Sequence, residues 1–182
     1  MKMNLPNKIT CVRVILIPFF LLFLLVPTIP ANRIIALVIF IIASLTDALD
    51  GHIARSRNLI TDFGKFMDPL ADKLLVCSAL ICFSYEHTLP VVVTIAIIAR
   101  EFIISGFRQV AADRGIVIAA SYWGKFKTTS QMILCVLLIL HLDLGWWHIL
   151  EQVFTWIALA LTIISLVDYM VKNKDVILKG SM

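Results

Sequence analysis

The chain has 182 residues, of which 60% are hydrophobic and only 15% are charged. Soluble domains carry about a quarter of charged residues, so this composition favours an integral membrane protein with a single domain over residues 1–182. The net charge of +4 does not indicate a nucleic-acid partner, because the basic residues lie at the ends of apolar runs. The four cysteines show no metal-ligand or disulfide spacing, and we expect reduced packing residues.

Six apolar segments, each long enough for a helix of about 20 residues, follow one another with short connections. The predicted helices cover residues 9–27, 33–55, 64–85, 90–112, 122–142 and 147–171. The first segment begins like a signal peptide, but Arg13 interrupts it and no small-residue cleavage site follows. The sequence therefore predicts an all-α integral membrane protein with six transmembrane helices in a bundle.

Basic residues gather at one end of each predicted helix. They are Lys2, Lys8, Arg13, Arg55, Arg57, Lys65, Arg108, Arg114, Lys125, Lys127, Lys172, Lys174 and Lys179. The opposite connections carry only Arg33, with the acidic residues Glu86 and Asp143. Because loops rich in lysine and arginine remain in the cytoplasm, we predict a multi-pass membrane protein with both termini in the cytoplasm. The histidines at 87, 141 and 148 then fall near the outer surface, where we expect interfacial positions.

Four aspartates occur at regular spacing in the second and third predicted helices: Asp47, Asp50, Asp68 and Asp72. The first two are three residues apart and the last two are four apart, so each pair shares one helix face. Small residues accompany both pairs and leave room for a bulky group near the backbone: Gly51, Ala54 and Gly64. Two antiparallel helices with a short loop would gather the four carboxylates in a pocket open to the cytosol.

Four carboxylates cannot stay ionised together at low dielectric without compensating charge. Two divalent cations, Mg²⁺ or Mn²⁺, would supply it, and paired metals of this kind recur in phosphoryl transfer. The alternative is a set of interhelical ion pairs with Arg55, Lys65 or Lys73. Ionisable residues inside a transmembrane bundle mark functional sites, so we predict a two-metal site.

The pattern Asp47-x-x-Asp50-Gly51-x-x-Ala54-Arg55, eight residues, Gly64-x-x-x-Asp68-x-x-x-Asp72 resembles the complete signature of the CDP-alcohol phosphotransferases. The resemblance implies a six-helix membrane enzyme that moves a phosphoryl-linked group from a CDP-alcohol to an acceptor hydroxyl and releases CMP. The stretches NLPNKITCVRVILIPFF, IAREFIISGFR and WGKFKTTSQM resemble the branch that uses CDP-diacylglycerol and glycerol 3-phosphate. That branch makes phosphatidylglycerophosphate for anionic lipid synthesis, so the resemblance implies an enzyme of the bacterial cytoplasmic (inner) membrane. The family also implies a homodimer.

The resemblance also implies roles for individual residues. The four aspartates would hold the two ions on the pyrophosphate, and Asp72 would be the general base for the acceptor's 1-hydroxyl. The CDP-binding residues would be Asn7, Thr10, Asp50, Gly51, Ala54, Arg55, Gly64 and Asp68. For Asn7 and Thr10, which form a polar stripe with Arg13, the alternative is a helix N-cap followed by a snorkelling arginine.

The fourth predicted helix carries Arg100 and Glu101 near its middle and Arg108 two turns later. Adjacent residues point apart on a helix, so we expect no Arg100–Glu101 ion pair and a partner for each on another helix. The acceptor's phosphate needs cationic recognition, for which we predict Arg108 and Lys125 first and Arg100 next. For Lys125 and Lys127 the alternative is a role in membrane orientation and contact with anionic lipids only.

Two other functions are compatible with parts of this pattern. The same family includes enzymes that use inositol phosphate, inositol or serine, although an acceptor without phosphate leaves Arg108 and Lys125 without a partner. A divalent-cation transporter would also place carboxylates in the membrane. Transporters often show internal repeats or broken helices in both halves, whereas here the acids cluster in one hairpin.

Overall fold

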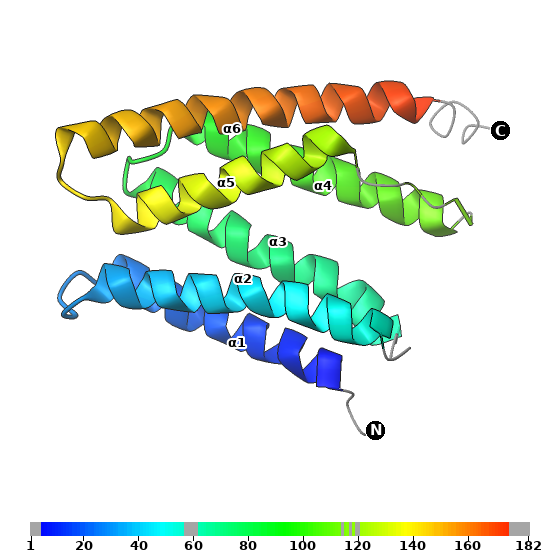
Figure 1. The fold of residues 1–182 in the computed structure, drawn as a ribbon, viewed down its shortest axis with the longest axis horizontal. Helices are drawn as coiled ribbons and strands as arrows, with labels where there is room; N and C mark the ends of the chain where they lie inside the picture. Colours follow the sequence, from blue (N-terminus) through cyan, green and yellow to red (C-terminus); the bar gives the residue numbers. More distant parts are fainter. Residues whose placement is uncertain (1–4, 57–61, 114, 117, 119–120, 175–182) are drawn as a thin grey trace. The chain divides into compact units, whose positions relative to one another are not determined.

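The computed structural model describes residues 5–56, 62–113, 115–116, 118 and 121–174. In this part of the chain all regular structure is helical, and the six helices lie where the hydropathy predicts them (Figure 1). They are α1 (Leu5–Leu25), α2 (Asn32–Ser56), α3 (Asp62–Tyr85), α4 (Val91–Asp113), α5 (Tyr122–Leu140) and α6 (Gly145–Lys172). Side chains are outside the description at residues 5–6, 47–56, 62–66, 68–69, 72 and 113.

The chain forms two compact units, and α1, α2 and α3 belong to the first, Met1–Glu86. Along α1 the buried residues recur every three or four positions: Asn7, Thr10, Arg13, Ile17, Phe20 and Leu24. Such spacing places them on one face, and α1 packs against both α2 and α3. The rings of Phe20 and Phe40 meet there with centroids 5.6 Å apart. The first half of the α1 face is polar and the second half apolar.

The second unit, His87–Met182, contains α4, α5 and α6, and α6 packs against both of the others. The buried positions of α6 again recur every three or four residues: Glu151, Thr155, Ala158, Thr162, Ser165 and Tyr169. Most of these side chains are small, so neighbouring helices can approach closely. The hydroxyls of Thr155 and Thr162 donate to carbonyls four residues earlier, at 2.7 and 2.6 Å, which satisfies them within the helix.

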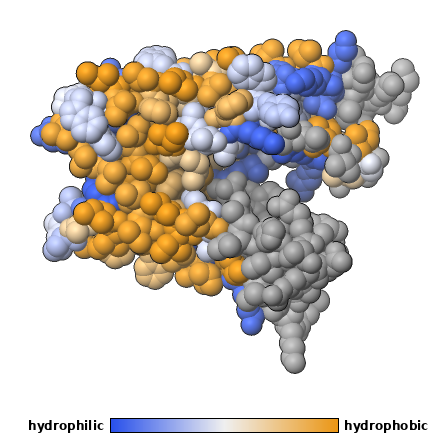
Figure 2. Space-filling model, in the orientation of Figure 1, coloured by the Kyte–Doolittle hydropathy of each residue, from blue (hydrophilic) through white to orange (hydrophobic). Residues whose placement is uncertain are grey.

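Large apolar side chains also cover the surface of both units (Figure 2). Ile15, Ile34, Trp156 and Val171 are each about 60% exposed. Among the residues that the structure describes, two helices contain candidate membrane spans, Asn7–Leu25 and Gly145–Lys172, and only 28% of each hydrophobic window is buried. Apolar helices that turn most of their surface outward are typical of a membrane protein and not of a soluble core. Transmembrane placement of all six helices stays a prediction.

In the described part of the connections, three residues other than glycine have a positive φ. Ala31 (φ 55°) precedes α2, His87 (φ 60°) lies between α3 and α4, and His141 (φ 38°) caps the end of α5. At the other end of α5, Ser121 is the N-cap, and its hydroxyl accepts a hydrogen bond from the Gly124 N–H at 3.1 Å. The four cysteines are free, and three of them are buried, as predicted.

Candidate functional site

The polar stripe of α1 is buried inside the first unit. Thr10 is fully buried and Arg13 is 1% exposed. The Nε–H of Arg13 donates to the hydroxyl of Thr46 on α2 at 3.5 Å, and that hydroxyl donates to the Ala43 carbonyl at 2.7 Å. The alternative of an N-cap and a snorkelling arginine is therefore wrong, since Asn7 lies inside α1 and Arg13 points inward.

This stripe leads to the aspartate pattern, because Thr46 immediately precedes Asp47 in α2. The backbone is helical at all four aspartate positions, so the spacings of three and four residues correspond to one face of α2 and one face of α3. These two helices run in opposite directions within the first unit and contact each other (Figure 1). The hairpin that the aspartates require is present.

The side chains of the whole signature lie outside the described residues. They are Asp47, Asp50, Gly51, Ala54, Arg55, Gly64, Asp68 and Asp72. Their predicted roles in metal binding, CDP binding and base catalysis therefore stay predictions. What the structure adds is the buried neighbour of this segment, Arg13, whose guanidinium reaches the residue next to the first aspartate.

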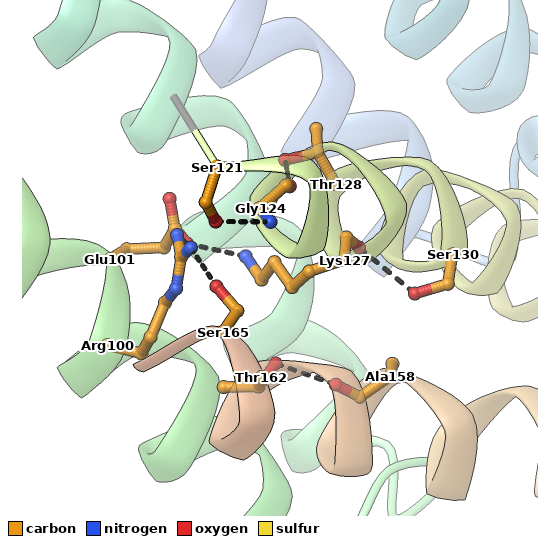
Figure 3. A network of polar contacts seen from close by, with 10 residues as sticks. All are labelled: Arg100, Glu101, Ser121, Gly124, Lys127, Thr128, Ser130, Ala158, Thr162 and Ser165. Carbon is orange, nitrogen blue, oxygen red and sulfur yellow. Dashed lines mark hydrogen bonds and ion pairs between the residues drawn. The ribbon is translucent and has the colours of Figure 1, made fainter. Parts of the chain in front are cut away.

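A second polar cluster joins the three helices of the second unit (Figure 3). The carboxylate of Glu101 on α4 forms ion pairs with the guanidinium of Arg100, at 2.8 Å, and with the ammonium of Lys127 on α5. Arg100 also donates through its second terminal nitrogen to the Ser165 hydroxyl on α6. Two cations share one carboxylate, so the cluster carries one positive charge in excess.

The ion pair between Arg100 and Glu101 contradicts our expectation from helix geometry. Neighbouring Cβ atoms do point apart, but the long arginine side chain bends back and reaches the carboxylate from the adjacent position. The second part of the expectation is confirmed. Glu101 has a partner on α5 and Arg100 has one on α6, as each charge near the middle of an apolar helix requires.

Lys127 is 2% exposed, so it does not contact lipid headgroups as the alternative assumed. The first turn of α5 closes over the same cluster. A Cβ atom built on Gly124 would lie 3.5 Å from a terminal nitrogen of Arg100, and the N–H of Gly124 is bound by the Ser121 cap. The capped first turn of α5 therefore lies directly beside the arginine, at a distance that an alanine at position 124 would also allow (Figure 3).

The other two predicted acceptor-binding residues are exposed and lie over different tyrosine rings. The guanidinium of Arg108 is 5.7 Å from the ring centroid of Tyr169, and the ammonium of Lys125 is 5.4 Å from that of Tyr122. The Tyr169 hydroxyl and the Nε of Arg100 are buried without a hydrogen-bond partner among the described residues. Both are hydrogen-bond donors that the described protein groups leave unused.

Two features escaped the sequence reasoning. Ser165 received no role, because a single serine in an apolar helix carries no signal of its own. Glu151 also received none, yet it is buried and bound by His141 and His148. The spacing His148-x-x-Glu151 places both side chains on one helix face and could have revealed this cluster.

A family model for CDP-alcohol phosphatidyltransferases matches residues 3–164. The chain belongs to this family of CDP-alcohol phosphotransferases, whose members generally depend on divalent metals. It is 42% identical to a CDP-diacylglycerol–glycerol-3-phosphate 3-phosphatidyltransferase of Bacillus subtilis, over 93% of this chain and 95% of the relative. The enzyme of the same name from Haemophilus influenzae is 41% identical, over 93% of both chains. A probable phosphatidylglycerophosphate synthase of Mycobacterium tuberculosis is 40% identical, over 93% of this chain and 81% of the relative.

Proposed function

We propose that this protein transfers the phosphatidyl group of CDP-diacylglycerol to the 1-hydroxyl of sn-glycerol 3-phosphate, giving phosphatidylglycerophosphate and CMP. One observation carries this proposal: relatives with this activity in their names match 93% of the chain at 41–42% identity. The helical hairpin with four aspartate positions and the buried polar stripe beside it are compatible with the same chemistry.

Asp47, Asp50, Asp68 and Asp72 would hold two divalent cations, Mg²⁺ or Mn²⁺. The donor set fits, because four carboxylates offer the hard oxygen ligands that these ions prefer. The helical backbone at all four positions also agrees with two pairs of ligands on facing helices. When bound, the ions would neutralise charge on the donor's pyrophosphate.

The chain's own residues then orient the donor and move one proton. Asp72 takes the proton from the 1-hydroxyl of glycerol 3-phosphate, whose oxygen attacks the β-phosphorus of CDP-diacylglycerol. The new phosphorus–oxygen bond joins acceptor and phosphatidyl group, and the bond from the β-phosphorus to the oxygen shared with the α-phosphate breaks. CMP leaves with that oxygen. Glycine and alanine on the aspartate helices leave space for the nucleotide: Gly51, Ala54 and Gly64.

The remaining donor contacts would come from Arg55 near the phosphates and from Asn7 and Thr10 on α1. Their place on the same buried stripe as Arg13, whose guanidinium reaches Thr46 beside the first aspartate, supports their part. Arg108 and Lys125 would bind the acceptor's phosphate because both are exposed cations. Arg100 is the third candidate for binding the acceptor's phosphate, because two of its three guanidinium nitrogens already donate to Glu101 and Ser165.

The proposal includes a location and an assembly. The basic ends of the helices support an inner-membrane enzyme with six spans, both termini in the cytoplasm and an active site on that side. Membrane lipids surround it, and a homodimer follows from the family alone. The exposed apolar surface of both units supports the membrane location.

The test is CMP release by the purified protein in detergent with CDP-diacylglycerol and a panel of acceptors. We expect release with glycerol 3-phosphate and none above background with inositol, serine or inositol phosphate. Turnover with another acceptor would keep the family and replace the substrate. Absence of CMP release with every acceptor, from folded protein with Mg²⁺ or Mn²⁺ present, would contradict the proposed reaction.

A further inference from the structure

Three metal-ligating side chains meet where α5 ends and α6 begins, at the left of Figure 1. His141 is the C-cap of α5, and His148 and Glu151 lie three residues apart in the first turns of α6. The Nδ1 atom of His141 is 2.9 Å from one carboxylate oxygen of Glu151, and the Nδ1 atom of His148 is 3.1 Å from the other. Both imidazoles thus face the same carboxylate.

The cluster is held in place by its surroundings. Glu151 is 6% exposed, whereas the side chains of His141 and His148 are 33% and 41% exposed. The indole N–H of Trp147 donates to the Leu137 carbonyl at 3.2 Å and ties the start of α6 to the last turn of α5. The buried carboxylate is therefore fixed, and the two histidines can still be reached by an ion from outside.

The chemistry of these three side chains suits a transition metal. Two imidazoles and one carboxylate form a common zinc ligand set that leaves a fourth position for water or another ligand. Hard cations such as Mg²⁺ prefer oxygen ligands alone, so this set discriminates against the ions expected at the aspartates. A fully exposed carboxylate, that of Asp143, lies 3.7 Å from the second ring nitrogen of His148.

The distances also suit such an ion. One ligand atom from each of the three residues lies within 4.8 Å of the others. In a tetrahedral zinc site with bonds of about 2.0–2.2 Å, ligand atoms are roughly 3.3–3.6 Å apart. The longest edge, at most 4.8 Å, therefore needs to contract by about an ångström, and the two contacts of 2.9 and 3.1 Å need to widen by a few tenths of an ångström. The exposed histidines can provide that movement.

We propose that His141, His148 and Glu151 form a binding site for a transition-metal ion of the zinc type. This site shares no residue with the four-aspartate signature and does not depend on the proposed reaction. It lies at the opposite end of α5 from Lys127, about 21 Å away along the helix axis. A bound ion would clamp the end of α5 to the start of α6 and stabilise the second unit.

The probe is Zn²⁺ itself, added to chelator-treated full-length protein in detergent with excess Mg²⁺ to occupy the hard-oxygen sites. The metal retained after dialysis is counted by mass spectrometry, and Co²⁺ absorption reports coordination by nitrogen ligands. His148→Gln is the main variant, because its side chain is 41% exposed and we expect the fold to tolerate its replacement. His87→Gln is the matched control, since this exposed loop histidine lies outside the cluster.

We expect the wild type and His87→Gln to retain about one more Zn²⁺ per chain than His148→Gln or Glu151→Gln. Zinc affinity should fall at least on the order of 10–100-fold in His148→Gln. Loss of a group that only hydrogen-bonds to a zinc ligand already lowers metal affinity by about this factor, and His148 would be a ligand itself. Zinc should also raise the melting temperature of the wild type but not of His148→Gln. Equal retention and affinity in the wild type and His148→Gln would overturn the proposal. So would zinc binding that is lost in Asp68→Asn and kept in His148→Gln.

Discussion

The ammonium group of Lys127 is buried against the carboxylate of Glu101 on the neighbouring helix. The same carboxylate holds the guanidinium of Arg100, so one anion neutralises two cations. Because of this asymmetry, we expect the removal of each of the three side chains to have a different effect on stability. Removal of the carboxylate leaves two buried cations together, whereas removal of the lysine leaves one intact pair.

We therefore predict that Glu101→Gln destabilises the protein more than Lys127→Met. Loss of one partner from a buried ion pair destabilises a protein by about 3–5 kcal/mol. The Glu101 side chain is 20% exposed, so we expect Glu101→Gln to lie at the lower end of this range. About 3 kcal/mol lowers the melting temperature by roughly 6–12 °C in a chain of this size. Thermal unfolding in detergent is the measurement. The double variant should recover part of the loss, and Lys125→Met, an exposed lysine on the same helix, should change little. A larger effect of Lys127→Met would contradict this account.

Arg108→Ala should impair use of glycerol 3-phosphate and spare CDP-diacylglycerol. A charged hydrogen bond contributes about 1.5–3 kcal/mol, so kcat/KM for the acceptor should fall on the order of 10–150-fold. Steady-state kinetics with each substrate varied in turn separate the two effects. Gln109→Ala, the next exposed position of α4, is the matched control. Unchanged acceptor kinetics in folded Arg108→Ala protein would remove this arginine from the acceptor site.

Asp72→Asn should lower turnover by about 10²–10⁴-fold, because the amide keeps the size of the side chain but cannot accept the proton. Asp47→Asn should also inactivate, chiefly through weaker metal binding, so excess Mg²⁺ or Mn²⁺ should restore part of its turnover. Excess metal should not rescue Asp72→Asn. CMP release across a metal titration distinguishes the two variants. If Asp72→Asn keeps near-normal turnover at ordinary metal concentration, the assignment of the base is wrong.

Chelation provides a readout that does not depend on activity. Without metal, four carboxylates in one pocket repel one another, so chelator should lower the melting temperature of the wild type. Any single Asp→Asn change in the signature should reduce that loss. Identical sensitivity to chelator in the wild type and all four variants would argue against the two-metal site.

The predicted topology can be tested with cysteines introduced at Glu86, Asp143 and Arg57. An impermeant thiol reagent added to intact cells should label the first two positions and leave the third unlabelled until the cells are opened. Of the native cysteines, Cys77, Cys82 and Cys135 are buried. Cys11 is partly exposed but lies on the cytoplasmic side in this topology, so background labelling from outside should be low. Strong external labelling at Arg57 would reverse the orientation and place the active site on the wrong face.

The sequence predicts the helices well because apolar length is a local property. The segment expected at 33–55 is α2 at Asn32–Ser56, and the one expected at 122–142 is α5 at Tyr122–Leu140. The polar stripe of α1 was also visible from its spacing. What spacing cannot predict is how far a side chain bends. Arg100 reaches its sequence neighbour, and Lys127 turns into the unit where the alternative placed it at the surface.

The left-handed residues in the connections have a practical consequence. A residue with a Cβ atom destabilises the folded state by roughly 1–2 kcal/mol in this conformation, and glycine avoids that cost. Glycine also makes the unfolded chain more flexible, which lowers the free energy of unfolding by about 0.4–1 kcal/mol. Ala31→Gly and His87→Gly should therefore be neutral or raise the melting temperature by a few degrees, whereas β-branched residues there should lower it. Both positions lie outside the aspartate signature, the cluster around Glu101 and the cluster of His141, His148 and Glu151. Each offers a way to make this enzyme more durable in detergent while its chemistry is left untouched.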